Sequence, residues 1–338
     1  MPRVARLALI LVVAFLIAGG AAFIWYQRQV DPPGKPGKLT SVVIPQGSAE
    51  ATIAAILDDK GIITSARVFK VYLRLHPGEL KAGMYSLRQR SSMGDVVGAL
   101  DLGPKTTFHR LTIPEGFRLK QIAERVDKLP GKSGEAFLAA AASGRVRSEF
   151  QPAGSNSLEG LVFPDTYFIE DKNDEEQILA RMVSKFDEVA RAEGLSAGNA
   201  NYNAYQTLVI ASLVESEGKV AEDRPKIAQV IYNRLKVGMP LQIDATVIYA
   251  RGGRRPDGRV LFSDLEVDSP YNTYKVKGLP PTPISATGRA AIRAALKPTD
   301  GPWLFYVKYQ EDGTHKFTVT LAEHNAAIRD AKRRGVNP

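Results

Sequence analysis

The sequence predicts an α+β protein with a single N-terminal transmembrane helix, a small β/α module and a larger mixed α/β domain. Three observations carry this prediction: an uncharged apolar run near the N-terminus, a β–turn–helix pattern that occurs twice, and long amphipathic stretches after residue 155. The 338 residues leave room for about two domains of ~100–200 residues, each with its own core. The content of 44% hydrophobic and 24% charged residues is typical of a globular protein and excludes a disordered or collagen-like chain.

Composition also limits the chemistry of the protein. The chain has no cysteine, which excludes disulfides, thiolate zinc sites, iron–sulfur clusters and a cysteine nucleophile. Its four histidines stand at no metal-ligand spacing, so a zinc hydrolase is not expected. With 45 Lys and Arg against 36 Asp and Glu, the net charge of +9 suits an anionic surface or polymer. A basic soluble face without a partner explains this charge equally well.

The apolar run Leu7–Tyr26 carries no charge and, at about 1.5 Å per helical residue, can span the ~30 Å hydrocarbon core of a bilayer. Arg3 and Arg6 precede it, so the positive-inside rule keeps the N-terminus in the cytoplasm and places everything after Gln27 across the membrane. A cleaved signal peptide is the alternative, because small residues (Ala18–Ala22) lie near the end of the run. We expect a retained single-pass anchor in the plasma (inner) membrane, with the rest of the chain on the periplasmic or outer side. Neither ATP nor a nucleic acid is expected as a partner there.

Changes in composition divide the chain into segments. Pro and Gly in the stretch Asp31–Lys38 predict an extended spacer that holds the globular part off the membrane. The predicted segments are 1–28 for the cytoplasmic tip and anchor, 29–38 for the spacer, 39–108 for the small module, 109–154 for a second β/α repeat with a connector, and 155–338 for the larger domain.

A near-repeat predicts the small module and its continuation. The sequence VIPQG at Val43–Gly47 recurs as TIPEG at Thr112–Gly116. Each copy indicates a short strand, a Pro-x-Gly turn and an amphipathic helix, and a strand at 83–87 and a helix at about 92–100 lie between the copies. The alternation resembles the LysM modules that bind the glycan of peptidoglycan. A purely structural spacer domain is the alternative.

After residue 155 the patterns predict a mixed domain whose central helix is buried against a layer that contains β-strands. Three prolines within four positions predict a rigid loop at Gly278–Ile284. The other expected elements are helices at 174–193, 204–217 and 224–235, a hairpin with strands at 303–309 and 316–320, and a basic helix that starts near Leu321.

Two carboxylates end the apolar helix at 204–217 and are candidates for catalysis. Glu215 and Glu217 lie at its C-terminal end, where the helix macrodipole disfavours negative charge. Burial and the dipole both raise a carboxyl pKa, which is the condition for a general acid near neutral pH. The alternative is that each carboxylate is solvated or paired with Lys219 or Arg224. Helical periodicity does not choose between the two carboxylates.

Loops rich in Asn, Gln, Tyr and Thr follow this helix, at 241–249 and 269–274. Amides form hydrogen bonds with hydroxyls and flat rings stack on sugar faces, so such loops suit a neutral polyhydroxyl ligand. The same residue types also cap helices and fill turns, which is the alternative for each of them taken alone.

A serine nucleophile is the competing chemistry. Ser216–Lys219 fits the S-x-x-K signature of penicillin-binding enzymes, and Lys132–Gly134 is similar to their K-[ST]-G motif. The second motif lies upstream of the first, however, and its surroundings indicate a loop rather than a strand. Acyl-enzyme chemistry is therefore not expected.

Several linked motifs in order carry a family resemblance. The stretches LVIASLVESEGKVAEDRPKIAQVIYNRLKVGMPLQIDATVIYA, SPYNTYKVKGLPPTPI and LAEHN resemble the YceG-like (MltG) family of endolytic murein transglycosylases. The resemblance covers nearly the whole chain beyond the spacer and is strongest over 155–330. The order of anchor, LysM-like module and catalytic domain agrees with it. Glu215-Ser216 also resembles the Glu-Ser pair of the broader lytic transglycosylases, which favours Glu215 as the catalytic residue.

The resemblance implies cleavage of the β-1,4 bond between N-acetylmuramic acid and N-acetylglucosamine inside glycan strands, with a 1,6-anhydro ring left on the muramic acid. The substrate's own C6 hydroxyl attacks C1, so one carboxyl serves in turn as acid and base, and no metal or cofactor is needed. The stretch Glu159–Tyr167 also matches the family and is interpreted as scaffold. Five residues at matching positions are assigned to binding the glycan: Glu217, Gln242, Asp244, Asn272 and Tyr274.

In the family this activity is linked to ending glycan polymerisation near the membrane, which implies peptidoglycan synthases as further partners. The alternative from another class of function is a membrane-anchored scaffold that binds peptidoglycan without cutting it. Such a scaffold has no need of a carboxyl at the end of an apolar helix. Glu215 is therefore the feature that distinguishes the two.

Overall fold

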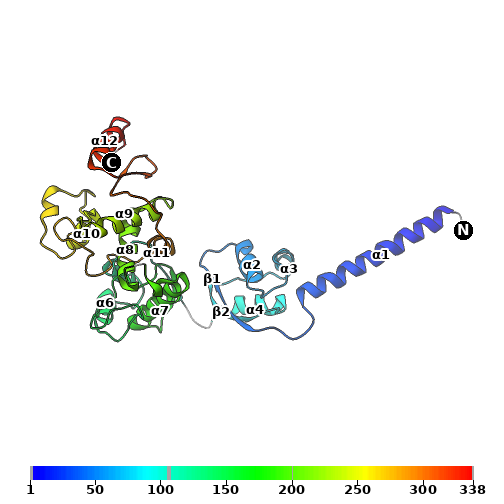
Figure 1. The fold of residues 1–338 in the computed structure, drawn as a ribbon. Coiled ribbons are helices and arrows are strands. Elements are labelled where there is room, and N and C mark those ends of the chain that lie inside the picture. Colours follow the sequence, from blue (N-terminus) through cyan, green and yellow to red (C-terminus); the bar gives the residue numbers. More distant parts are fainter. Residues whose placement is uncertain (1–2, 105–107, 200, 337–338) are drawn as a thin grey trace. The chain divides into compact units, whose positions relative to one another are not determined.

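The computed structural model describes residues 3–104, 108–199 and 201–336, with side chains from residue 13 onward. The chain divides into two compact units, Met1–His109 and Arg110–Pro338 (Figure 1). Each unit has a hydrophobic core of its own and combines helices with short strands. The predicted α+β class is confirmed.

The first unit is built around a two-stranded antiparallel sheet. Its strands pair in a register that runs from Leu39 opposite Arg88 to Ile44 opposite Gly83. The strand and the helix predicted between the two copies of the near-repeat are β2 and α4. The elements of this unit are α1 (Arg3–Val30), β1 (Leu39–Ile44), α2 (Glu50–Asp59), α3 (Ala66–Leu75), β2 (Gly83–Arg88) and α4 (Met93–Leu102).

The end of α1 and the Pro/Gly-rich segment after it lie against this unit. Tyr26 and Val30 pack on its core, and the Thr64 hydroxyl donates to the Gln29 carbonyl at 2.8 Å. Further along, the Gly37 N–H donates to the carbonyl of residue 89 at 2.7 Å. The segment predicted as an extended spacer therefore contacts the module. Pro and Gly form no regular structure there, so its backbone groups find partners at the end of the neighbouring strand.

Among the helices in the described part of the chain, none combines the length and the apolar character of a membrane span. The predicted anchor Leu7–Tyr26 begins in a stretch whose side chains lie outside the described residues. The anchor stays a prediction.

The second unit is mostly helical and contains two small sheets. One pairs β3 with β4, and the other is the antiparallel hairpin of β5 and β6. The predicted helices, hairpin and C-terminal helix are confirmed as α7, α8, α9, β5–β6 and α12. The elements are β3 (Phe108–Thr112), α5 (Leu119–Val126), α6 (Gly134–Ala142), β4 (Thr166–Glu170), α7 (Glu175–Glu193), η1 (Leu195–Ala197), α8 (Ala204–Glu217), α9 (Arg224–Lys236), α10 (Asp244–Ala250), η2 (Phe262–Glu266), α11 (Arg289–Leu296), β5 (Phe305–Lys308), β6 (His315–Thr318) and α12 (Leu321–Arg333).

Helix α8 lies among the other helices of this unit. Asn203 caps its first turn by accepting from the Gln206 N–H at 2.9 Å, and every residue from Thr207 to Val214 is buried. Its main neighbours are α11 and α9 (Figure 1), followed by η1 and α10, so the prediction of a strand-containing layer against it is wrong. Paired strands of four or five residues are too small to enclose a helix that is apolar all round, whereas several helices can.

The core of the second unit extends across the boundary that the sequence places at 154/155. Ile113 and Phe137, from the second β/α repeat and the connector, belong to the same cluster as Phe186 and Leu213. This shared core brings the second copy of the near-repeat to the end of α8 that carries the candidate carboxylates.

Candidate active site

The C-terminal end of α8 presents both candidate carboxylates. The helix ends at Gly218, whose N–H donates to the Val214 carbonyl at 2.8 Å. A Cβ at position 218 would lie 2.6 Å from Cγ of Arg224, so the glycine leaves room for this arginine to cross the helix end. Arg224 Nε donates to the Gly218 carbonyl at 2.9 Å, which directs the guanidinium toward Glu215.

Glu215 is held by two donors from other elements. Its side chain is 3% exposed, Oε1 accepts from Arg224 Nη2 at 3.0 Å, and Oε2 accepts from the Gly288 N–H at 2.9 Å. Gly288 is the N-cap of α11, so the carboxyl lies between the unfavourable end of one helix and the favourable end of another. Pairing with Arg224, predicted as the alternative to a catalytic role, is present together with burial.

The pKa of the Glu215 carboxyl is raised above its ordinary value. Burial is the largest cause, whereas the Gly288 N–H and the positive charge of Arg224 lower this pKa, and the nearby Glu115 carboxylate raises it again. A raised pKa leaves more of the side chain protonated near neutral pH, as a general acid requires.

Glu215 faces a cavity of about 290 Å³, which we call the Glu215 cavity. Arg118, Tyr249 and Arg254 contribute guanidinium and phenol groups to its lining. Ser285 also lines it, with a buried hydroxyl that has no hydrogen-bond partner among the described residues. The cavity therefore offers donors around a carboxyl that can exist in either protonation state.

The sequence does not single out Arg118 and Arg254, because they come from separate segments with no common spacing, whereas Tyr249 ends the polar stretch 241–249. Ser285 does have a signal, since it follows directly on the Pro-rich loop at Gly278–Ile284. The N–H of Ile284 donates to Ser212 Oγ at 3.2 Å, which attaches the end of that loop to α8.

Glu217 faces a second cavity, of about 470 Å³, which we call the Glu217 cavity and which Gln242, Asp244 and Tyr274 also line. Tyr306 on β5 donates to Glu217 Oε2 at 3.0 Å, and Tyr274 donates to Asp244 Oδ1 at 2.6 Å. Burial raises the pKa of Glu217 to about 7, although the Tyr306 hydrogen bond lowers it. The structure thus brings four of the five predicted binding residues together, in a cavity separate from that of Glu215.

Gln242 has an unusual backbone conformation in the Glu217 cavity. Its φ of +49° lies in the left-handed region, which residues other than glycine rarely adopt. The Gln242 N–H donates to the Thr273 carbonyl at 3.0 Å, which holds the residue in place. Backbone strain of this kind clusters at binding and catalytic sites.

Asn272 lines neither cavity and is fully buried. Its Nδ2 donates to the carbonyls of Leu265 and Val267, each at 2.8 Å, and its Oδ1 accepts from the Tyr274 N–H at 3.0 Å. The structure therefore places Asn272 where it shapes the loop that carries Tyr274, rather than where it would contact a glycan.

The stretch Glu159–Tyr167 contains a buried carboxyl behind the Glu215 cavity. Glu159 Oε1 accepts from the Leu119 N–H at 2.9 Å, at the start of α5, and Oε2 accepts from the Tyr249 hydroxyl at 3.3 Å. Burial raises the pKa of Glu159 to about 7, and the two hydrogen bonds lower it. Four further residues of the stretch pack in the core, namely Leu161, Val162, Phe163 and Tyr167, and the Tyr167 hydroxyl donates to the Phe163 carbonyl at 2.6 Å.

Comparison with known proteins identifies the family of this chain. The family model described as the YceG-like family matches residues 42–330. The chain belongs to the YceG-like family. The resemblance predicted from the sequence motifs is confirmed.

Relatives in this family match most of the chain. The endolytic murein transglycosylase of Bacillus subtilis (strain 168) is 34% identical over 328 residues, which cover 92% of this chain and 90% of the relative. The endolytic murein transglycosylase of Streptococcus pneumoniae (strain D39) is 30% identical over 349 residues, which cover 94% of this chain and 63% of that longer relative. The crystal structure of a yceG-like protein from Listeria monocytogenes superposes with a TM-score of 0.58 and 33% identity, over 85% of this chain and 98% of that chain.

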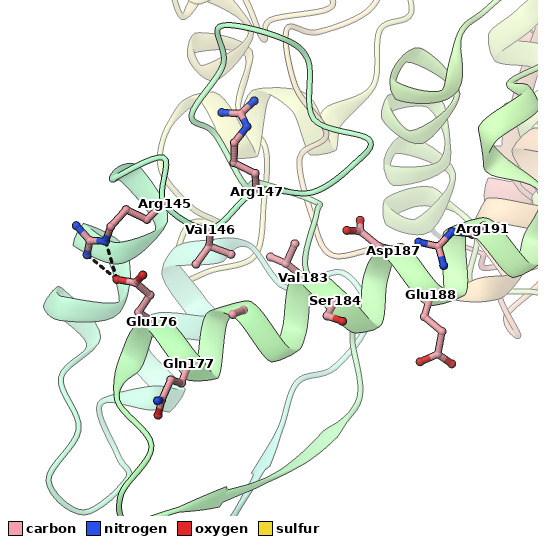
Figure 2. A pocket seen from close by; sticks show the side chains of 11 residues that line it. Arg145, Val146, Arg147, Glu176, Gln177, Val183, Ser184, Asp187, Glu188 and Arg191 are labelled. Atoms are coloured by element: carbon pink, nitrogen blue, oxygen red, sulfur yellow. Dashed lines mark hydrogen bonds and ion pairs between the residues drawn. The ribbon is translucent and has the colours of Figure 1, made fainter.

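A larger cavity of this family member, of about 630 Å³, lies beside α7 and shares no lining residue with the two carboxylate cavities (Figure 2). Its cations are already paired: Arg145 lies 2.6 Å from Glu176, and Arg191 lies 2.9 Å from Glu149. Arg147 donates to two backbone carbonyls.

Across the residues that the structure describes, no group of three or more His, Asp or Glu side chains is arranged to hold a metal ion.

Proposed function

We propose that this protein is a membrane-anchored endolytic lytic transglycosylase of peptidoglycan. It cleaves the β-1,4 bond between N-acetylmuramic acid and N-acetylglucosamine in nascent glycan strands and leaves 1,6-anhydro-N-acetylmuramic acid ends. The observation that carries the proposal is the buried Glu215 carboxyl, held by Arg224 and Gly288 beside an open cavity. Among the described residues that line this cavity, Glu215 is the one carboxylate.

The enzyme class has support beyond the site. The relatives that match more than nine-tenths of this chain are named endolytic murein transglycosylases, and murein is peptidoglycan. The predicted class, a peptidoglycan lytic transglycosylase, is confirmed. The bond that is cleaved, the anhydro product and the membrane location are the finer parts of the proposal.

One carboxyl is enough for this reaction because the substrate supplies its own nucleophile. Protonated Glu215 donates its proton to the glycosidic oxygen, and the bond between that oxygen and C1 of the muramic acid breaks. The carboxylate then accepts the proton of the C6 hydroxyl while the C6 oxygen forms its bond to C1, which restores protonated Glu215. No water is consumed, whereas an ordinary glycosidase needs two carboxylates beside the bond.

The two donors to Glu215 suit a group that alternates between acid and carboxylate. After the first proton transfer, Arg224 and the Gly288 N–H stabilise the negative charge through charge-assisted hydrogen bonds. Burial favours the return of the proton in the second step. The site is therefore balanced between both forms, as a residue that acts first as acid and then as base requires.

The Glu217 cavity is proposed to bind sugars next to the cleaved bond. Gln242 and Asp244 are exposed, so their polar groups are available to sugar hydroxyls, and the ring of Tyr274 offers a flat surface for a sugar face. Ala245 lines the Glu215 cavity directly after Asp244, which shows that one segment borders both cavities. A glycan strand can thus contact both.

The location of the enzyme is proposed from the sequence. The run Leu7–Tyr26 anchors the chain once in the plasma (inner) membrane, with the N-terminus in the cytoplasm and the active site on the periplasmic or outer side. The end of α1 packs on the first unit, which keeps that LysM-like unit near the bilayer. An active site tethered in this way meets newly made strands, so the enzyme ends glycan elongation, with peptidoglycan synthases as partners and the LysM-like unit binding glycan.

The test uses the full chain in detergent, its Glu215→Gln variant and purified peptidoglycan, with products identified by mass spectrometry. We expect anhydro-ended fragments from inside the strands, and a loss of about 10²–10⁴-fold in the variant, because general acid–base catalysis contributes that much. Reducing-end products with added water would instead indicate a hydrolase. If the protein sediments with peptidoglycan and releases nothing even with its membrane partners present, the scaffold function is correct.

A further inference from the structure

The turn of the second near-repeat copy is part of the Glu215 site. After β3, the TIPEG sequence turns at Gly116, whose φ is +77°. The Gly116 N–H donates to the Ala286 carbonyl at 2.8 Å, and the Ala286 N–H donates to the Phe117 carbonyl at 2.7 Å. This pair of hydrogen bonds attaches the turn to the segment before α11, two residues from the Gly288 N–H that holds Glu215.

The turn carries a second carboxylate to the same cation. Glu115 Oε2 lies 3.8 Å from Arg224 Nη2, the nitrogen that lies 3.0 Å from Glu215 Oε1. The Glu115 side chain is 50% exposed, against 3% for Glu215. It also lies directly over Gly288, since a Cβ at that position would be 1.8 Å from Glu115 Oε1. Two carboxylates from distant segments therefore share one guanidinium.

Sharing the guanidinium changes the charge balance at Glu215. An arginine devoted to one carboxylate favours its ionised form, and a second negative charge opposes that effect. The groups that face Glu215 are Arg224 from α9, the N-terminal end of α11 at Gly288, and Glu115 from the turn. Arg118 and Arg254 line the same cavity and add positive charge. Glu115 is the negative group in this set.

We propose that Glu115 is a positioning residue for Glu215. By sharing Arg224, the Glu115 carboxylate weakens the stabilisation that this arginine gives to ionised Glu215, so that Glu215 keeps the proton that it donates. This inference rests on the proposed role of Glu215 as general acid. Glu115 acts through Glu215 and takes no part in bond making. The pKa of Glu215 agrees with this role, because the charge of Glu115 and its hydrogen bond both raise it.

The near-repeat itself provides a comparison. The position that Glu115 occupies in the second copy is occupied by Gln46 in the first, where the turn is exposed in the other unit. A neutral amide therefore fits the same Pro-x-Gly turn. The carboxylate is present in the copy that contacts the catalytic end of α8.

The test measures the protonation of Glu215 directly and also the pH profile of the reaction. The full chain in detergent is labelled with carbon-13 at the glutamate carboxyls, and the Glu215 signal is identified by its loss in Glu215→Gln. The pH titration of this signal is then compared in wild type, Glu115→Gln and Glu115→Asp. The matched control is Glu135→Gln, which removes the same charge from an exposed position on α6.

We expect Glu115→Gln to move the Glu215 titration to lower pH, and to move the alkaline limb of the activity profile in the same direction. Glu115→Asp, which keeps the charge, stays nearer to wild type, and Glu135→Gln leaves both unchanged. A Glu215 titration that stays in place in Glu115→Gln overturns the inference, as does an activity loss that is equal at every pH. If the titration moves but no variant or wild type cleaves peptidoglycan, the coupling stands and the proposed function fails.

Discussion

At the scale of residues, the main feature is the different surroundings of two carboxylates on one helix. Glu215 and Glu217 are two positions apart, which at 3.6 residues per turn separates their directions by about 200°. One therefore faces the cavity with Arg118 and Ser285, and the other faces the cavity with Tyr306. Local sequence makes both look alike, and packing gives them different neighbours in separate cavities.

This separation predicts different kinetic effects for the two residues. We expect Glu217→Gln to raise KM about 10–100-fold, because a hydrogen bond to a charged group contributes ~1.5–3 kcal/mol to binding. The kcat should change little, since in the proposed function Glu217 binds substrate and transition state alike. Steady-state kinetics on a soluble glycan substrate measure both values. A fall in kcat as large as that of Glu215→Gln would instead make Glu217 a second catalytic group.

At the scale of elements, Glu159 connects two helices that border the Glu215 cavity. Its carboxyl accepts from the first residue of α5 and from Tyr249 on α10. This connection explains why a buried carboxyl occurs in a stretch that is otherwise largely apolar and buried. It also makes the stability of the second unit dependent on pH.

Burial raises the Glu159 pKa from 4.5 to about 7, so between these pH values the folded chain holds a proton that the unfolded chain has released. The free energy of unfolding therefore falls as pH rises through this window. In Glu159→Gln we expect the free energy of unfolding to decrease by up to about 3 kcal/mol less over this pH window than in wild type, because one pKa unit corresponds to 1.36 kcal/mol. Urea denaturation of both proteins between pH 4.5 and 8 measures it. Parallel stability curves would contradict the assignment.

At the scale of the whole molecule, the sequence predicts a membrane anchor, and the described chain forms two units with separate cores. The first unit is joined to the end of α1 by Tyr26 and Val30. Glu215, the proposed catalytic residue, belongs to the second unit. Retention at the membrane should therefore depend on the apolar run alone, whatever the state of the active site.

We expect the full chain to remain in carbonate-washed membranes, and the double variant Val12→Arg, Phe15→Arg to be released. Each arginine near the centre of a span costs about 2.5–3.5 kcal/mol on the insertion scale. The matched control is the double variant Gln27→Arg, Gln29→Arg, because it adds the same charge outside the apolar run. Retention of the double variant would contradict the anchor, and N-terminal sequencing distinguishes it from a cleaved signal peptide.

Much of the fold could be predicted because its signals are local. The apolar run of α8, its Asn203 cap and the glycine after it predict both ends of the helix from neighbouring residues. The β5–β6 hairpin and α12 are predicted in the same way. The layer against α8 was predicted wrongly, since the choice between strands and helices as neighbours depends on contacts between distant segments.

The sequence by itself determined the helix that carries two carboxylates, the polar loop at 269–274 and the family to which the chain belongs, whereas most of the expected loop at 241–249 is helix α10. Only the tertiary structure decided that Glu215 meets Arg224, Gly288 and Glu115, and that Glu217 joins Gln242 in another cavity. The physical reason is that helix ends and turns follow from neighbouring residues. The surroundings of a buried charge are instead set by groups far apart along the chain, which only the packing of the core brings together.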